Sequence, residues 1–277
     1  MPILIWMAVL IYYPMVDGFY LSLTDQSTIG GFASFVGLQT YFAVLSNKDY
    51  LYSIVNSVIW TAENEVIQTL LGLGGALILN EKLRGIRWAR SLILLPWMLP
   101  TVVVAIVFHF MLSAELGVIN HYLMAFGIVE KPLVLLGSPQ NAMPTAILIN
   151  SWRFVPFVMV LILAGLKTIP EELYEAANID GASSFQKFRY VTLPSLYPIF
   201  AAVGLIGTIW QFNYFDFPYL LTRGGPGLST ATMPVMMYML MTRYMFSSRS
   251  YVLSMIMFVI LLAFTLIYIK RVKPWGE

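Results

Sequence analysis

The stretch that decides the fold covers residues 166–194 and reads LKTIPEELYEAANIDGASSFQKFRYVTLP. Pro170 suits the first turn of a helix, because the N–H that proline lacks has no partner there. Acidic residues follow it, close to the positive end of the helix dipole. Gly181 permits a break, and Ser183 or Ser184 can cap a second short helix. The pattern therefore predicts a helix–bend–helix hairpin.

Long apolar stretches lie on both sides of this hairpin. A helix needs about 20 mostly apolar residues to cross a bilayer, and six stretches of the chain reach that length. We therefore predict an all-α integral membrane protein with one domain over residues 1–277. Its six predicted spans are about 2–22, 52–79, 88–112, 143–166, 195–221 and 250–270.

Composition supports the same class. The 277 residues are 59% hydrophobic and 11% charged, whereas soluble domains are about 45–50% apolar and about 25% charged. So many apolar side chains do not fit inside a water-soluble globule, although a very apolar soluble helical domain is the alternative. The net charge of +2 does not favour a nucleic-acid partner. Without cysteine, and with only His109 and His121, the sequence predicts no metal site.

The basic residues predict the orientation, since lysine and arginine gather in cytoplasmic segments. With the N-terminus inside, ten of them fall in predicted inner segments and five in outer segments. Both termini and the 167–194 hairpin are therefore predicted to be cytoplasmic. The inner residues are Lys82, Arg84, Arg87, Arg90, Lys167, Lys187, Arg189, Lys270, Arg271 and Lys273, and the outer ones are Lys48, Lys131, Arg223, Arg243 and Arg249.

A motif inside the hairpin resembles the EAA loop of binding-protein-dependent ABC importer permeases, and most closely the carbohydrate branch, the maltose-type permeases. Its residues are Ile169-Pro170, Glu175-Ala176-Ala177, Ile179-Asp180-Gly181-Ala182, Phe188 and Thr192-Leu193-Pro194. The resemblance extends over essentially the whole chain, through FVGLQTY at 35–41, LLPWMLP at 94–100 and YLLTRGGPG at 219–227. One departure is Arg223, where the family frequently has glycine.

The resemblance implies a type I ABC importer permease fold with a cytoplasmic EAA coupling hairpin that docks into an ATP-binding subunit. It also implies the partners: a second, related permease, two ATP-binding subunits and an extracytoplasmic solute-binding protein. The chain has no G-x-x-x-x-G-K-[ST] phosphate loop, so ATP and Mg are expected on the partner, and this chain is expected to be no enzyme and to bind no cofactor. The predicted coupling residues are Glu175, Ala176, Ala177, Asp180, Gly181, Leu193 and Pro194.

Two predicted spans carry polar and aromatic residues on one helical face, at i, i+3, i+4 and i+7. Sugars need both kinds of group, since rings stack on C–H faces while amides and guanidinium groups bind hydroxyls. In maltose-type permeases the equivalent stretches line the solute site. The alternative is that the faces pack against neighbouring helices, or that Arg153 pairs with Asp216 or Glu63. The predicted solute-binding residues are Asn150, Arg153, Phe154, Phe157, Gly207, Trp210, Gln211 and Tyr214.

The function implied is a permease subunit that moves a mono- or oligosaccharide into the cytoplasm of a prokaryote by alternating access across the inner membrane. A polyol or glycerol phosphate is the alternative solute. A different class is a secondary transporter driven by an ion gradient, whose folds often show internal repeats; none is visible here. A third class, a membrane enzyme, would need clustered catalytic groups.

The predicted spans contain further polar residues that are candidates for burial inside the protein. They are Glu63, Glu65, His109 and Asp216.

Overall fold

The computed structural model describes residues 6–25, 32–81 and 85–272. Parts of the predictions fall outside these ranges: the start of the 2–22 span and the basic residues Lys82, Arg84 and Lys273. Apart from an isolated bridge between Thr24 and Phe35, the regular structure of the described residues is helical. The prediction of an all-α fold is confirmed.

The structure is a succession of helices along the chain. Two of them, labelled η, are π-helical turns. In order, the elements are η1 (Ala8–Tyr12), α2 (Tyr13–Ser22), α3 (Gln39–Ser46), α4 (Lys48–Asn80), α5 (Ile86–Ile93), α6 (Leu95–Met98), α7 (Thr101–Met111), α8 (Val118–Ala125), α9 (Pro139–Leu166), α10 (Glu171–Ile179), α11 (Ser184–Lys187), η2 (Phe188–Thr192), α12 (Leu193–Ser195), α13 (Tyr197–Phe212), α14 (Asp216–Thr222), α15 (Met233–Thr242) and α16 (Ser247–Arg271).

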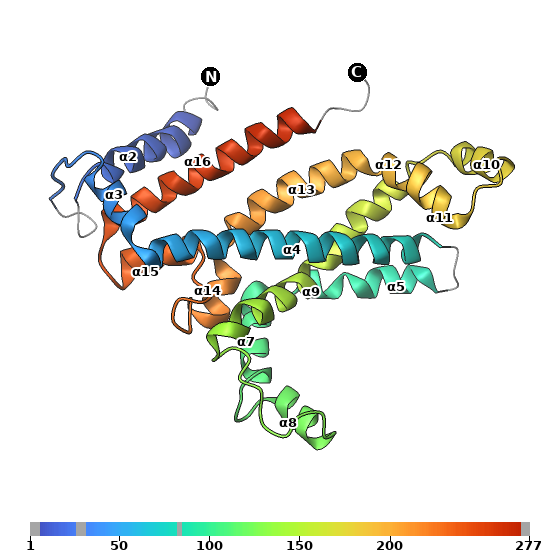
Figure 1. Cartoon of the computed structure of the whole chain (residues 1–277), viewed down its shortest axis with the longest axis horizontal. Helices are drawn as coiled ribbons and strands as arrows, with labels where there is room; N and C mark the ends of the chain where they lie inside the picture. The colour runs from blue at the N-terminus through green and yellow to red at the C-terminus, as the bar shows by residue number, and fades with distance from the viewer. Residues whose placement is uncertain (1–5, 26–31, 82–84, 273–277) are drawn as a thin grey trace.

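Helices α4 and α9 form the centre of the molecule (Figure 1). Small residues let them approach closely: a Cβ built on Gly72 would lie 2.9 Å from Cγ1 of Val158, and one on Gly75 would overlap the side chain of Met159. Such small-residue contacts replace the hydrophobic drive that is missing between helices in lipid. Helix α13 packs against the same pair. Three helices therefore share one interior.

The helices differ in length and continuity from the predicted spans. By length and composition, α9 and α16 can each cross a membrane. Two further crossings are possible if bent pairs count as one span: Trp88–Met98 with Thr101–Met111, bent by 85°, and Ser184–Ser195 with Tyr197–Phe212, bent by 57°. Helix α4 is long enough, but its middle is polar. The count of six spans stays a prediction.

The segment after α13 departs most from the sequence interpretation. The predicted span 195–221 is divided, because α13 ends at Phe212 and α14 begins at Asp216. The following segment was predicted as an outer loop, yet it contains α15, whose Met233, Val235 and Met236 are almost fully buried. Helix α15 packs against α16 and α4, so part of this loop belongs to the core.

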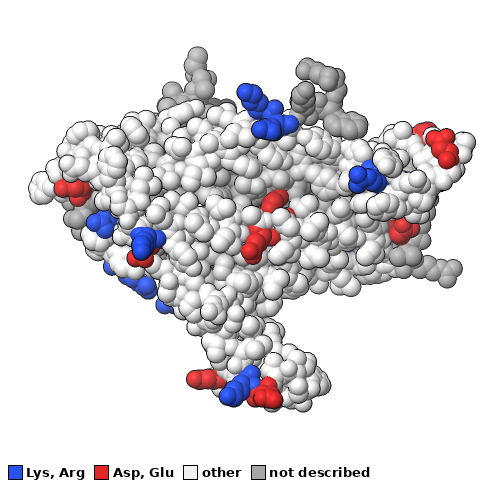
Figure 2. All heavy atoms as spheres, in the orientation of Figure 1, with Lys and Arg blue, Asp and Glu red and all other residues white. Residues whose placement is uncertain are grey.

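Figure 1 places α10 and α11 at one end of the molecule, where α4 and α9 end and α13 begins. Helices α7 and α8 project from the body as an arm. Figure 2 shows charged side chains near both ends of the molecule and on the arm, basic ones at the upper edge of its middle, and acidic ones near its centre. The rest of this face is uncharged, as a surface in contact with a bilayer must be.

Candidate functional site

The segment between α9 and α13 forms two short helices joined by a bend. Helix α10 begins after Pro170, whose ψ of 135° is still extended, one position later than predicted. Gly181 has a φ of +74°, in the left-handed region that glycine adopts without strain. Ser183 then caps α11 in a capping box with Gln186. Of the two serines proposed as caps, Ser183 makes the contact.

Side-chain contacts tie the two halves of this hairpin together. The hydroxyls of Tyr174 and Thr192 share a hydrogen bond of 2.9 Å, and Lys187 Nζ donates to Asn178 Oδ1 at 2.9 Å. Beneath the hairpin lies a groove of about 510 Å³ that reaches from Asn80 at the end of α4 to α10. The hairpin is therefore attached to the helix bundle at its base.

The outer surface of the hairpin carries the predicted coupling residues. Glu175, Ala176, Asp180, Gly181 and Leu193 are exposed, and Ala177 and Pro194 are half-buried. Large apolar side chains beside them are also exposed, among them Ile179 at 88%, Phe185 at 69% and Tyr190 at 71%. An apolar surface of this kind, rimmed by acids, is typical of a protein–protein contact.

A network of side-chain amides lies inside the bundle, at the level where α4, α9 and α13 meet. Asn64 Oδ1 accepts hydrogen bonds from Asn150 Nδ2 at 2.7 Å, Ser151 Oγ at 3.1 Å and Gln68 Nε2 at 3.1 Å. Asn150 Nδ2 also donates to Gln211 Oε1 at 3.1 Å, and Gln211 Nε2 donates to Gln68 Oε1 at 3.2 Å. The four amides form a closed ring.

This ring changes the interpretation of two predicted solute residues. Asn150 is fully buried and Gln211 is 4% exposed, and both bond to neighbouring helices, as the packing alternative expects. Asn64 and Gln68 were not singled out in the sequence. Their i, i+4 spacing, which places both amides on one face of α4, was the available signal.

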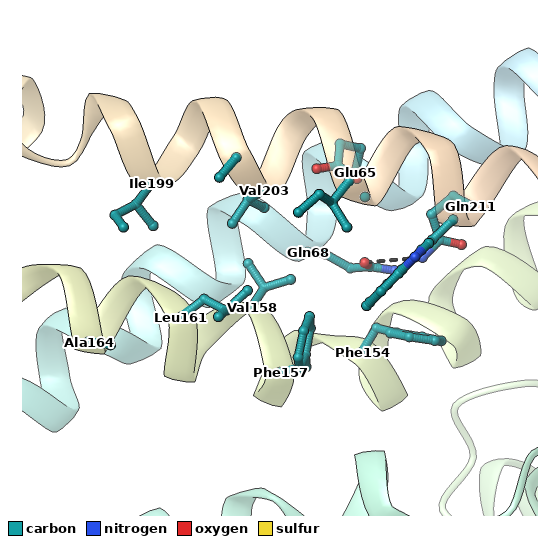
Figure 3. Close-up of a pocket in the computed structure, with 14 residues that line it drawn as sticks. Glu65, Gln68, Phe154, Phe157, Val158, Leu161, Ala164, Ile199, Val203 and Gln211 are labelled. Atoms are coloured by element: carbon teal, nitrogen blue, oxygen red, sulfur yellow. Dashed lines mark hydrogen bonds between the residues drawn. The ribbon is translucent and has the colours of Figure 1, made fainter. Parts of the chain in front are cut away.

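A pocket of about 340 Å³ lies next to the ring, between α9 and α13 (Figure 3). Five of the predicted solute residues line it: Phe154, Phe157, Gly207, Trp210 and Gln211. The ring centres of Phe157 and Trp210 lie 5.8 Å apart, and Trp97 stacks on Phe157 with ring centres 5.2 Å apart. The pocket therefore combines aromatic faces with an amide edge.

Arg153 and Tyr214 lie beside the pocket without lining it. Arg153 Nη1 donates to the Tyr214 hydroxyl at 2.6 Å, and Nη2 donates to the Leu99 carbonyl at 3.3 Å. The guanidinium also lies 5.1 Å from the centre of the Phe154 ring. No ion pair of Arg153 with Asp216 or Glu63 is found among the described residues: both acids are exposed, and two of the guanidinium nitrogens bond elsewhere.

The further buried candidates differ from one another. Glu63 and Asp216 are exposed, so they are not buried groups. His109 donates from Nδ1 to the Leu221 carbonyl at 3.0 Å and joins α7 to α14. Glu65 is partly buried and lines the pocket. No group of three metal-binding side chains is found in the part of the chain that the structure describes.

Comparison with known proteins gives one family and several close relatives. Residues 68–272 match the family described as "Binding-protein-dependent transport system inner membrane component". The trehalose/maltose transport system permease protein MalF of Thermococcus litoralis is 36% identical, over 98% of this chain and 90% of its own length. The sulfoquinovosyl glycerol transport system permease protein SmoG of Agrobacterium fabrum is 31% identical, over 98% of this chain and 88% of its own.

The fold is also found among solved structures. A crystal structure of a bacterial ABC transporter involved in the import of the acidic polysaccharide alginate superposes with a TM-score of 0.86. The match covers all of this chain and 94% of that chain, at 21% identity. A second structure, of the alginate transporter with a periplasmic protein bound to an alginate pentasaccharide, matches with a TM-score of 0.83 at 22% identity, over 96% and 90% of the two chains.

Proposed function

Because the chain belongs to the family of binding-protein-dependent transport system inner membrane components, we propose that it provides half of the membrane passage of an ATP-driven sugar importer. It is a transport subunit and not an enzyme. Its family membership excludes the secondary-transporter alternative. The proposed partners are a second, related permease, two ATP-binding subunits that hold ATP and Mg, and an extracytoplasmic solute-binding protein.

The proposal that the solute is a sugar rests on the pocket between α9 and α13. Phe157 and Trp210 offer ring faces to C–H groups. Gln211 makes one bond through each polar atom in the amide ring, so a second N–H and a second oxygen lone pair remain for hydroxyls. Pockets of this kind, apolar with a few placed polar groups, are typical of small-molecule sites. The names of the permeases from Thermococcus and Agrobacterium, one for trehalose and maltose and one for sulfoquinovosyl glycerol, agree with a sugar-like solute.

Glycerol phosphate fits this pocket less well. A phosphate is usually bound by arginine or lysine, and among the described residues that line the pocket none is basic. Arg153, which precedes the pocket residue Phe154 in the chain, already donates to Tyr214 and Leu99. A neutral sugar or polyol needs no cation.

The hairpin is the proposed link to ATP hydrolysis. Glu175 would meet a basic residue of the ATP-binding subunit, and Ile179, Phe185 and Tyr190 would be covered by the same contact. Hydrogen bonds to charged groups contribute about 1.5–3 kcal/mol. Because the hairpin connects α9 to α13, its displacement would reshape the pocket that these helices line, which is the step that alternating access requires.

The test is sugar uptake by the assembled transporter in proteoliposomes, with ATP inside and the binding protein outside. We expect ATP-dependent uptake of radiolabelled maltose or trehalose. Trp210→Ala should lower uptake, because it removes a ring from the pocket. The matched control is Trp88→Ala on α5, where the side chain is 75% exposed and lies outside the pocket. Equal uptake by the two variants would remove the pocket from the solute path.

A further inference from the structure

One acidic residue, Glu65, lines the pocket together with the aromatic rings. It lies near the middle of α4, and Figure 3 shows it beside α13, close to the hydrogen-bonded pair Gln68 and Gln211. None of the coupling or amide contacts described above uses it. A carboxyl group this deep in a helix bundle is costly and is usually kept for a function.

Gly207 leaves room for the Glu65 carboxyl, but no described residue forms a hydrogen bond or an ion pair with it. It lies directly against Gly207 of α13, where a Cβ atom would overlap the carboxyl oxygens. Its Oε1 is buried, yet no hydrogen-bond donor reaches it. A buried acceptor without a donor costs about 1–3 kcal/mol, so the site is incomplete until a donor arrives.

Among the described residues that line the pocket, none could neutralise a second negative charge brought next to Glu65. The other described residues that line the pocket are uncharged, with amides at Gln68 and Gln211 and otherwise apolar side chains. Arg153 is absent from that lining and is bonded to Tyr214 and Leu99. The pocket thus presents one acidic acceptor and no cation among its described residues.

We infer that Glu65 makes this pocket select neutral, hydroxyl-rich solutes over acidic ones. Its carboxylate accepts hydrogen bonds from sugar hydroxyls, which supply the missing donor to Oε1. A carboxylate, sulfonate or phosphate on the solute would instead bring two negative charges together in a poorly solvated space. Either the charges repel or one group must take up a proton, and both cost affinity. This inference rests on the proposed sugar function and names the class of sugar.

The test compares two solutes that differ by one carboxylate, maltose and its aldonic acid maltobionate. Their binding to the assembled transporter in nanodiscs is measured at mildly alkaline pH by saturation-transfer difference NMR, which detects weak complexes. We expect the unmodified protein to bind maltose about tenfold more tightly than maltobionate or better, since like charges a few ångströms apart cost at least that factor. Glu65→Gln keeps the shape of the side chain and should reduce the preference to within about threefold.

The matched control is Glu63→Gln, which removes a carboxyl two residues away on the same helix. Glu63 is exposed and does not line the pocket, so this variant should keep the full preference for maltose. The inference is overturned if the unmodified protein binds both solutes equally, or if Glu65→Gln keeps the preference. Binding of maltobionate alone would leave sugar import standing and remove only the role of Glu65. Binding of neither solute would overturn the sugar assignment as well.

Discussion

Replacing Asn64 should weaken the packing of α4 against α9, because this one side chain holds several hydrogen bonds inside the bundle. Its Oδ1 accepts three hydrogen bonds, from Asn150, Ser151 and Gln68, so Asn64→Ala leaves three buried donors without this acceptor. Side-chain hydrogen bonds between membrane helices contribute about 0.6 kcal/mol each on average, which gives about 2 kcal/mol in total. The small cavity left by the deletion adds to this loss.

The measurement is the free energy of unfolding of the chain in mixed micelles, followed by helical circular dichroism during titration with sodium dodecyl sulfate. The control is Asn213→Ala, because Asn213 is exposed and donates only to the Ile209 carbonyl of its own helix; a surface change of this kind costs under about 0.5 kcal/mol. If both variants lose the same small amount of unfolding free energy, the amide ring does not hold the three helices together.

Three further variants test other contacts. Glu175→Lys should abolish sugar-stimulated ATP hydrolysis by the assembled transporter and leave membrane insertion intact, whereas normal stimulation would exclude the coupling role. Gly181→Ala forces a side chain into a φ of +74° and should destabilise the hairpin by about 1–2 kcal/mol, seen as faster amide exchange in α10; unchanged exchange would contradict it. Tyr214→Phe removes an acceptor from Arg153 and should lower the unfolding free energy by about 1–3 kcal/mol; lost uptake at unchanged stability would instead mean that Tyr214 touches the solute.

The sequence allowed prediction of features that depend on local chemistry. The bend at Gly181 and the cap at Ser183 follow from single residues and their neighbours, and the structure places both within the expected hairpin. The resemblance to maltose-type permeases also rested on a contiguous motif, and membership of that permease family is confirmed. The roles of the individual coupling and solute residues stay predictions.

Features that need several helices in register were missed. Asn150 and Gln211 looked like free solute ligands because their partners Asn64 and Gln68 lie far away in the sequence. Acidic partners were considered for Arg153 from the sequence, but in the structure it donates to the Tyr214 hydroxyl and the Leu99 carbonyl. Helix α15 has ten residues, too few for a search that looks for spans of about 20.

The 57° bend at Leu196 joins α13 to a helical segment of residues 184–195 that begins in the hairpin. Gln211 lies 15 residues beyond this hinge, or about 22 Å along a helix that rises 1.5 Å per residue. A tilt of α13 by about 10° around the hinge would therefore sweep Gln211 sideways by roughly 4 Å. That displacement is comparable to the width of a sugar ring, so under the proposed alternating access a modest rotation at Leu196 would be enough to open or close the passage.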